Sequence, residues 1–291
     1  MGYSSWSDDA YRSVSGARSG APGSEIFRGE RSVDPLMNPH GLGKREARDS
    51  EHHPNSLPII VAFDVTGSMG DIPTRFAQTL LGQLMTQLVE QGWATDPQLL
   101  FAAVGDAVSD RAPLQVGQFE SGLEMDMWLT RIWLEAGGGD SPESYALAHW
   151  FAARHTATDA WEKRRKKGYL FTIGDAEDKP LTSTQLHRVF GATGSFQTSS
   201  SDAVAAAAER YEVFHIHVTR GQPPHGPTVA AWRALVGDRL LILDQTAAVC
   251  TLIGVAIAVR EGRMERAQAR AELIAAGMAA DAADDAVVGI G

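Results

Sequence analysis

Apolar and polar positions change together in blocks along the chain. Apolar segments predict strands over 57–63, 99–105, 169–174, 213–219 and 240–243, with a short edge strand over 114–119. Between the first two, Ile72, Phe76, Leu80, Leu84 and Leu88 recur at steps of four and predict a helix that ends before Gly92. Further helices are expected over 123–134, from Ser141 onward, and over 184–190, 203–211, 229–236, 247–260 and 264–277.

Strands that alternate with helices are typical of an α/β protein. Parallel neighbours need long crossover connections, and the spacing of these strands provides them. The pattern therefore predicts a doubly wound, mostly parallel, Rossmann-like sheet of about six strands with helices on both faces.

The pattern also divides the chain into three parts. Residues 1–56 form a polar N-terminal arm, rich in Ser, Gly and Arg, which is expected to be partly disordered and partly docked on its neighbour. Residues 57–262 form the α/β domain, and residues 263–291 form an Ala-rich, helical C-terminal tail.

Composition narrows the classes of protein. The 291 residues carry 26 basic against 36 acidic side chains, a formal net charge of −10, which disfavours nucleic acid as the main partner. The single cysteine, Cys250, excludes an intrachain disulfide and favours a reducing compartment. The most apolar run, 247–259, is shorter than the roughly 20 residues that span a bilayer, and no secretory signal is visible, so we expect a cytoplasmic protein without membrane contact.

Short oxygen-bearing side chains follow the predicted strands at what should be one edge of the sheet. The first strand ends in Asp64, with Thr66 and Ser68 after it; Asp140 follows a run of three glycines, and Asp175 follows the 169–174 strand. Such hard oxygen ligands select Mg²⁺, Mn²⁺ or Ca²⁺, and carboxylates gathered without a basic partner favour a cation between them. Asp106 and Asp110 follow the second strand, and we interpret them as turn or supporting residues.

These motifs resemble the metal-ion-dependent adhesion site of the von Willebrand factor A family. The family's first motif is Asp-x-Ser-x-Ser, and the chain has Asp64-x-Thr66-x-Ser68. The second loop usually brings a threonine where this chain has Asp140, and the third brings an aspartate that matches Asp175. The resemblance covers about residues 57–260. It implies that Thr66 and Ser68 bind the metal directly, and that Asp64 and Asp175 bind it directly or through water.

The same resemblance implies a protein-binding module that receives a partner's Asp or Glu carboxylate at an open metal position. Intracellular relatives often act as adaptors beside AAA+ ATPases of the MoxR type. Two alternatives remain at this point: a structural subunit of a larger assembly, and a metal-dependent hydrolase. The hydrolase is disfavoured because Thr66-Gly67-Ser68-Met69-Gly70 lacks the first glycine of a serine-hydrolase elbow, and because no histidine is evidently placed to activate Ser68.

Asp140 generates the first prediction. With Asp64 and Asp175 it leaves one negative charge in excess beside a divalent cation, whereas threonine would leave the site neutral. Asp140→Thr should therefore weaken metal binding while making a bound metal more attractive to a partner carboxylate. Calorimetric titration of metal into both proteins measures the first effect. Equal or tighter binding by Asp140→Thr would show that Asp140 is not a ligand.

Overall fold

A computed structural model describes residues 4–27, 32–69, 71–135, 142–192 and 197–291; of Ser68 and Asp71 it describes the backbone alone. Its centre is a six-stranded sheet in the order β4-β3-β2-β6-β7-β8. Every neighbouring pair is parallel except β3 and β4. The strands are β2 Leu57–Asp64, β3 Pro97–Val104, β4 Leu114–Val116, β6 Gly168–Gly174, β7 Tyr211–Val218 and β8 Leu240–Leu243. The predicted α/β class and the mostly parallel sheet are confirmed.

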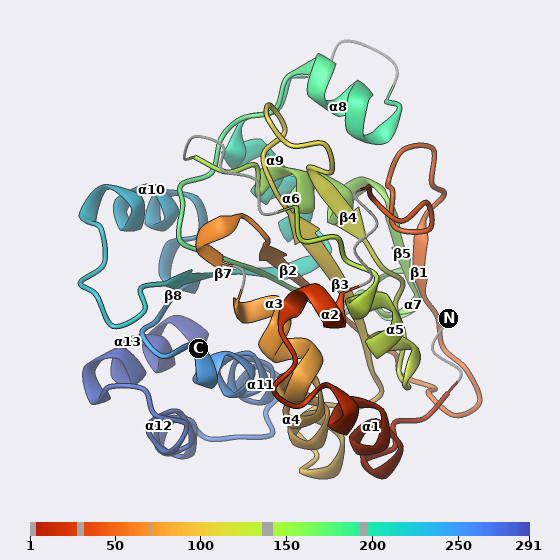
Figure 1. Ribbon diagram of the computed structural model, residues 1–291. Coiled ribbons are helices and arrows are strands. Elements are labelled where there is room, and N and C mark those ends of the chain that lie inside the picture. Colours follow the sequence, from red (N-terminus) through yellow and green to blue (C-terminus); the bar gives the residue numbers. More distant parts are fainter. Residues whose placement is uncertain (1–3, 28–31, 70, 136–141, 193–196) are drawn as a thin grey trace.

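Helices cover both faces of this sheet (Figure 1). One face packs against the helical segment 71–90 and against α5 Glu124–Thr130, α11 Val249–Arg260, α12 Arg266–Ala275 and α13 Ala280–Ile290. The other packs against α6 Ala146–Arg154, α8 Ser183–Phe190, α9 Ser200–Ala208 and α10 Gly226–Val236. Within the described residues, no helix is both long enough and apolar enough to cross a membrane.

The helix predicted over 72–88 contains two π-helical turns. It runs as α3 Asp71–Arg75, a π-helical turn Phe76–Leu80, α4 Leu81–Met85 and a second π-helical turn Thr86–Glu90. Apolar residues at steps of four would drift around a regular helix of 3.6 residues per turn. The wider π turns offset this drift, so all five predicted apolar side chains are buried on the same side: Ile72, Phe76, Leu80, Leu84 and Leu88.

The described residues of the N-terminal arm pack on the domain. Its elements are α1 Asp8–Ser15, α2 Gly23–Ile26 and β1 Arg45–Ala47, which pairs in parallel with β5 Thr156–Thr158 ahead of α7 Asp159–Arg164. Three-residue strands leave too few alternating positions for a sequence pattern to reveal them.

Two kinds of contact hold the arm. The Arg18 guanidinium donates to both carboxylate oxygens of Asp126 on α5, each at 2.6 Å. The backbone carbonyl of Met37 accepts a hydrogen bond from the N–H of Val116, so the arm occupies the free edge of strand β4. An edge strand that is covered in this way is protected from pairing with another chain.

Gly82 allows α1 to approach α4, and this close approach generates a prediction. A Cβ at Gly82 would lie 2.6 Å from the ring of Tyr11, which is buried. Gly82→Ala should therefore loosen the arm and lower the free energy of unfolding by about 1 to 3 kcal/mol. Limited proteolysis should release the first 27 residues faster than in the wild type. Gly226→Ala, in a helix where a Cβ meets nothing within 4 Å, is the control; equal cleavage of both variants would contradict this account.

Candidate metal centre

The carboxyl ends of β2 and β6 lie side by side at the centre of the sheet. In doubly wound sheets, ligands bind at this edge, where the strand order reverses. The last residue of β2 is Asp64, and Asp175 follows the last residue of β6. The structure thus brings two of the predicted site residues to one edge.

Asp64 is fully buried, and both of its carboxylate oxygens accept hydrogen bonds. Oδ1 accepts from the backbone N–H of Thr66 at 2.7 Å and from the Thr66 hydroxyl at 2.6 Å. Oδ2 accepts from the hydroxyl of Tyr145 at 3.0 Å. The turn after β2 therefore folds back onto the strand's own last side chain, which places the Thr66 hydroxyl beside the carboxylate.

Tyr145 reaches Asp64 only because residue 174 is glycine. A Cβ at Gly174 would lie 1.7 Å from the Tyr145 hydroxyl oxygen, a separation that no side chain tolerates. The Tyr145 ring is itself fully buried and makes edge contacts with His215 and Trp232. Tyr145 could not be identified from the sequence, because its role depends on a contact between positions 81 residues apart.

The two other predicted ligands are Ser68 and Asp140. Ser68 lies in a 3₁₀ turn, Gly67–Met69, of which the description covers the Ser68 backbone only. Asp140 lies outside the described residues, as does Ser141, the expected helix cap. The helix expected from Ser141 onward is present, but the predicted start is wrong, because α6 begins at Ala146. Residues before it form a bridge instead: Glu143 pairs in parallel with Asp178.

Glu143 is a second site residue that could not be identified from the sequence. The residue is 4% exposed, and its buried Oε2 atom has no hydrogen-bond partner within the part of the chain that the structure describes. The signal was present, since Glu143 follows Asp140 by three residues in the same Gly-rich stretch. Its burial beside Asp64 could not be predicted from that stretch, because the bridge to Asp178 draws it inward.

Two carboxyl groups at this edge, those of Asp64 and Glu143, have pKa values above their usual range. Burial, together with the negative charge of Asp175, raises the pKa of Asp64 to about 6 despite its hydrogen bonds. Burial and the charges of Asp64, Asp110 and Asp106 raise the pKa of Glu143 to about 8. Buried carboxylates that repel one another are a suitable environment for a cation.

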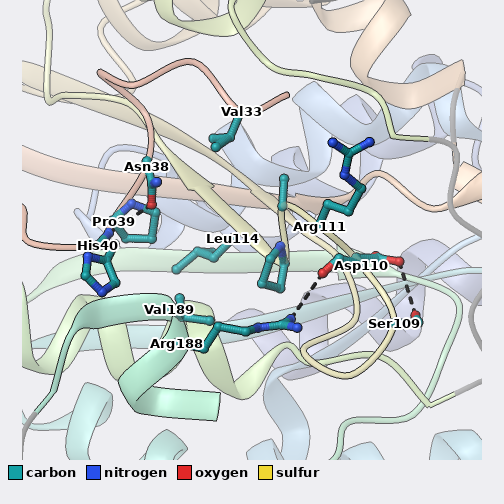
Figure 2. Close-up of a pocket in the computed structure, with 12 residues that line it drawn as sticks. Val33, Asn38, Pro39, His40, Ser109, Asp110, Arg111, Leu114, Arg188 and Val189 are labelled. Atoms are coloured by element: carbon teal, nitrogen blue, oxygen red, sulfur yellow. Dashed lines mark hydrogen bonds between the residues drawn. The ribbon is translucent and has the colours of Figure 1, made fainter. Parts of the chain in front are cut away.

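Asp106 and Asp110 close the turn after β3, in agreement with their interpretation as turn residues. Asp106 accepts hydrogen bonds from the backbone N–H groups of Val108 and Ser109, and Asp110 accepts one from the N–H of Asp106. Behind this turn lies a cavity of about 340 Å³ between the arm, residues 109–114 and α8 (Figure 2). Arg188 of α8 donates to the carbonyls of Ala107 and Asp110 and fixes the turn from that side.

The histidines of β7, His215 and His217, are buried in the core. His215 stacks on Trp232 with ring centroids 3.5 Å apart, and its Nδ1 lies 2.9 Å from the Thr172 hydroxyl. Burial lowers the pKa of His215 well below its usual value. Among the described residues, no three His, Cys, Asp or Glu side chains are grouped closely enough to hold a metal ion.

The donors at the Asp64 edge nevertheless suit a hard cation. They are all oxygen atoms, and the orphaned Oε2 of Glu143 is a buried acceptor in need of a positive partner. A cation here would combine the carboxylates with the Thr66 hydroxyl, which is the kind of ligand set that the sequence resemblance implies.

No protein-family model and no curated protein matches the chain. Solved structures with a similar chain path include the pilus adhesin SpaC of Lactobacillus rhamnosus GG, at 8% identity and a TM-score of 0.44 over 80% of this chain and 31% of the adhesin. Mussel-byssus proximal thread matrix protein 1, with a zinc-occupied MIDAS motif, aligns at 11% identity and a TM-score of 0.40 over 74% of this chain and 48% of its own. BatB of Bacteroides thetaiotaomicron aligns at 12% identity and a TM-score of 0.43, over 72% of this chain and 100% of BatB. The chain thus spans about a third and about half of the first two proteins.

The raised pKa values generate a prediction about pH. Because Asp64 and Glu143 hold protons more tightly when folded than when unfolded, the folded state binds more protons between about pH 4 and 8, and the free energy of unfolding falls as pH rises through that window. Glu143→Gln should remove the fall above pH 6 and stabilise the metal-free protein at pH 8 by at least about 2 kcal/mol. Urea unfolding in chelator at pH 5 to 8 measures this.

Exposed Glu209 supplies the matched control for that experiment. Glu209→Gln should keep the wild-type slope. A Glu143→Gln protein with the wild-type slope would show that Glu143 is not the strained carboxyl.

Proposed function

We propose that the chain is a metal-dependent protein-binding module that receives a carboxylate of its partner through a divalent cation at the Asp64 edge of the sheet. The observation that carries this proposal is the buried Oε2 of Glu143, which has no hydrogen-bond partner among the described residues and is repelled by the charge of Asp64. Thr66, Ser68, Asp64, Glu143 and Asp175 would hold the cation, with Asp140 as a further ligand. When bound, the cation supplies an electrophilic position for a ligand oxygen.

The resemblance to von Willebrand factor A domains supports the finer form of the proposal. In that form Mg²⁺ is the metal, the protein works as an adaptor in the cytoplasm, and a MoxR-type AAA+ ATPase is a candidate partner. A binding role rather than catalysis is supported by the chemistry around Thr66, whose hydroxyl donates to Asp64 and not to a histidine base. The structural-subunit alternative gains no support from the described arm residues, which pack on their own domain.

Metal addition should stabilise the fold, because only the folded chain gathers these donors. A cation at a hundredfold excess over its Kd adds about 2.7 kcal/mol to the free energy of unfolding. Thermal unfolding of chelated protein should therefore shift upward with Mg²⁺ or Mn²⁺. Asp175→Asn should reduce the shift, whereas Asp285→Asn, an exposed change on α13, should leave it unaltered.

The carboxylate-binding step has its own readout in the same samples. With Mn²⁺ bound, acetate should displace metal-bound water and lower the enhancement of water proton relaxation. No melting shift with Mg²⁺, Mn²⁺ or Ca²⁺ at millimolar concentration would refute the metal site. If Mn²⁺ raises the melting temperature but acetate does not change the water proton relaxation, the open position for a carboxylate is refuted.

A further inference from the structure

Lys179 places an ammonium group among the carboxyl groups of Asp64, Asp106, Asp110 and Glu143, which we call the carboxylate cluster. Its Nζ forms an ion pair with Oδ1 of Asp106, and the Lys179 side chain is 17% exposed against 4% for Asp106. Lysine side chains are among the least often buried. The presence of one beside buried carboxylates therefore calls for a physical account.

The backbone, and not the ion pair, fixes where Lys179 lies. Its N–H donates to the carbonyl of Glu143 at 3.2 Å, and the N–H of Glu143 donates to the carbonyl of Glu177 at 2.9 Å. This ladder joins the loop after β6 to the residues before α6. The segment would keep its path if the ammonium were removed.

Asp106 does not need Lys179 to complete its turn. Its Oδ1 accepts from Val108 N at 2.9 Å, and its Oδ2 accepts from the N–H and the hydroxyl of Ser109 at 3.1 and 2.8 Å. The ion pair therefore contributes charge more than shape.

The pair lies next to the candidate metal ligands. The Ser144 hydroxyl is 3.4 Å from Asp106 Oδ1, and the preceding residue is Glu143, whose buried Oε2 has no hydrogen-bond partner in the described ranges. The charges of Asp64, Asp110 and Asp106 act on Glu143 in one direction, and the charge of Lys179 acts in the other. Lys179 is thus electrostatically coupled to the carboxylates that face the cation.

We propose that Lys179 cancels the charge of Asp106 at the adjacent cation site, so that Asp106 does not add to the affinity of that site for the cation. This inference rests on the proposed function. The ammonium prevents the surplus of carboxylates from binding the metal so strongly that it becomes a poor acceptor. The metal thereby stays electrophilic toward a partner carboxylate.

A double-mutant cycle on the full chain tests the proposal, with Mn²⁺ as the probe and the Kd measured by calorimetry at pH 7.5. Lys179→Gln should bind Mn²⁺ about tenfold more tightly, because a like charge has been removed. Asp106→Asn should bind it about tenfold more weakly, because Lys179 is left uncompensated. The double variant should return to within about threefold of the wild type.

The directions in which the two single variants change the Kd for Mn²⁺ separate a charge effect from a structural one. If the ion pair served only to hold the loops, both single variants would weaken Mn²⁺ binding. Lys179→Arg keeps the charge and should keep the wild-type Kd. Lys166 lies just before the amino end of β6 and forms another ion pair, with Glu261. Lys166→Gln should also keep the wild-type Kd.

Two results would overturn the inference, and they differ in what else they overturn. If the wild type binds Mn²⁺ but Lys179→Gln binds it equally or more weakly, the inference fails and the proposed function stands. If the wild type binds no Mn²⁺, the proposed function fails and the inference fails with it.

Discussion

A carboxylate buried at the end of the central strand is the constraint on which the rest of this structure depends. Asp64 is fully buried, and its charge is opposed by the loss of water around it. Hydrogen bonds donated by Thr66 and by Tyr145 stabilise the charged carboxylate of Asp64. The second of these requires a glycine at position 174, at the end of the neighbouring strand, so one side chain dictates the residue types on three different elements.

The surrounding charges follow from the same constraint. Glu143 is drawn in by its backbone bridge to Asp178, and its Oε2 has no donor within the described part of the chain. Asp106 and Asp110 add negative charge nearby but are used by their own turn. Lys179 balances only the side of the cluster that contacts Asp106. Burial and mutual repulsion thus favour the protonated forms of Asp64 and Glu143, and a cation between them would favour the charged forms.

Peripheral segments pack around the domain that carries this site, and one of them holds the Asp106 turn. The arm pairs with strand β4 through Met37 and contacts α5 through Arg18, while α8 holds the Asp106 turn through Arg188. On the same face of the sheet as α5, α11 packs against α4, α12 and α13 and is buried from Val249 to Ala258, which explains its continuous apolar sequence. A preorganised site of this kind loses little conformational entropy when it binds a ligand.

The sequence by itself determined the order of strands and helices, since apolar runs and helical periodicity are local properties of the chain. It also indicated that Asp64, Thr66 and Asp175 follow strands whose ends share one edge. Only the tertiary structure decided that Tyr145 binds Asp64, that Glu143 is buried and unpartnered, and that Lys179 neutralises Asp106. These contacts join residues that are far apart in sequence. Their chemistry arises from burial and mutual charge, which a local pattern does not encode.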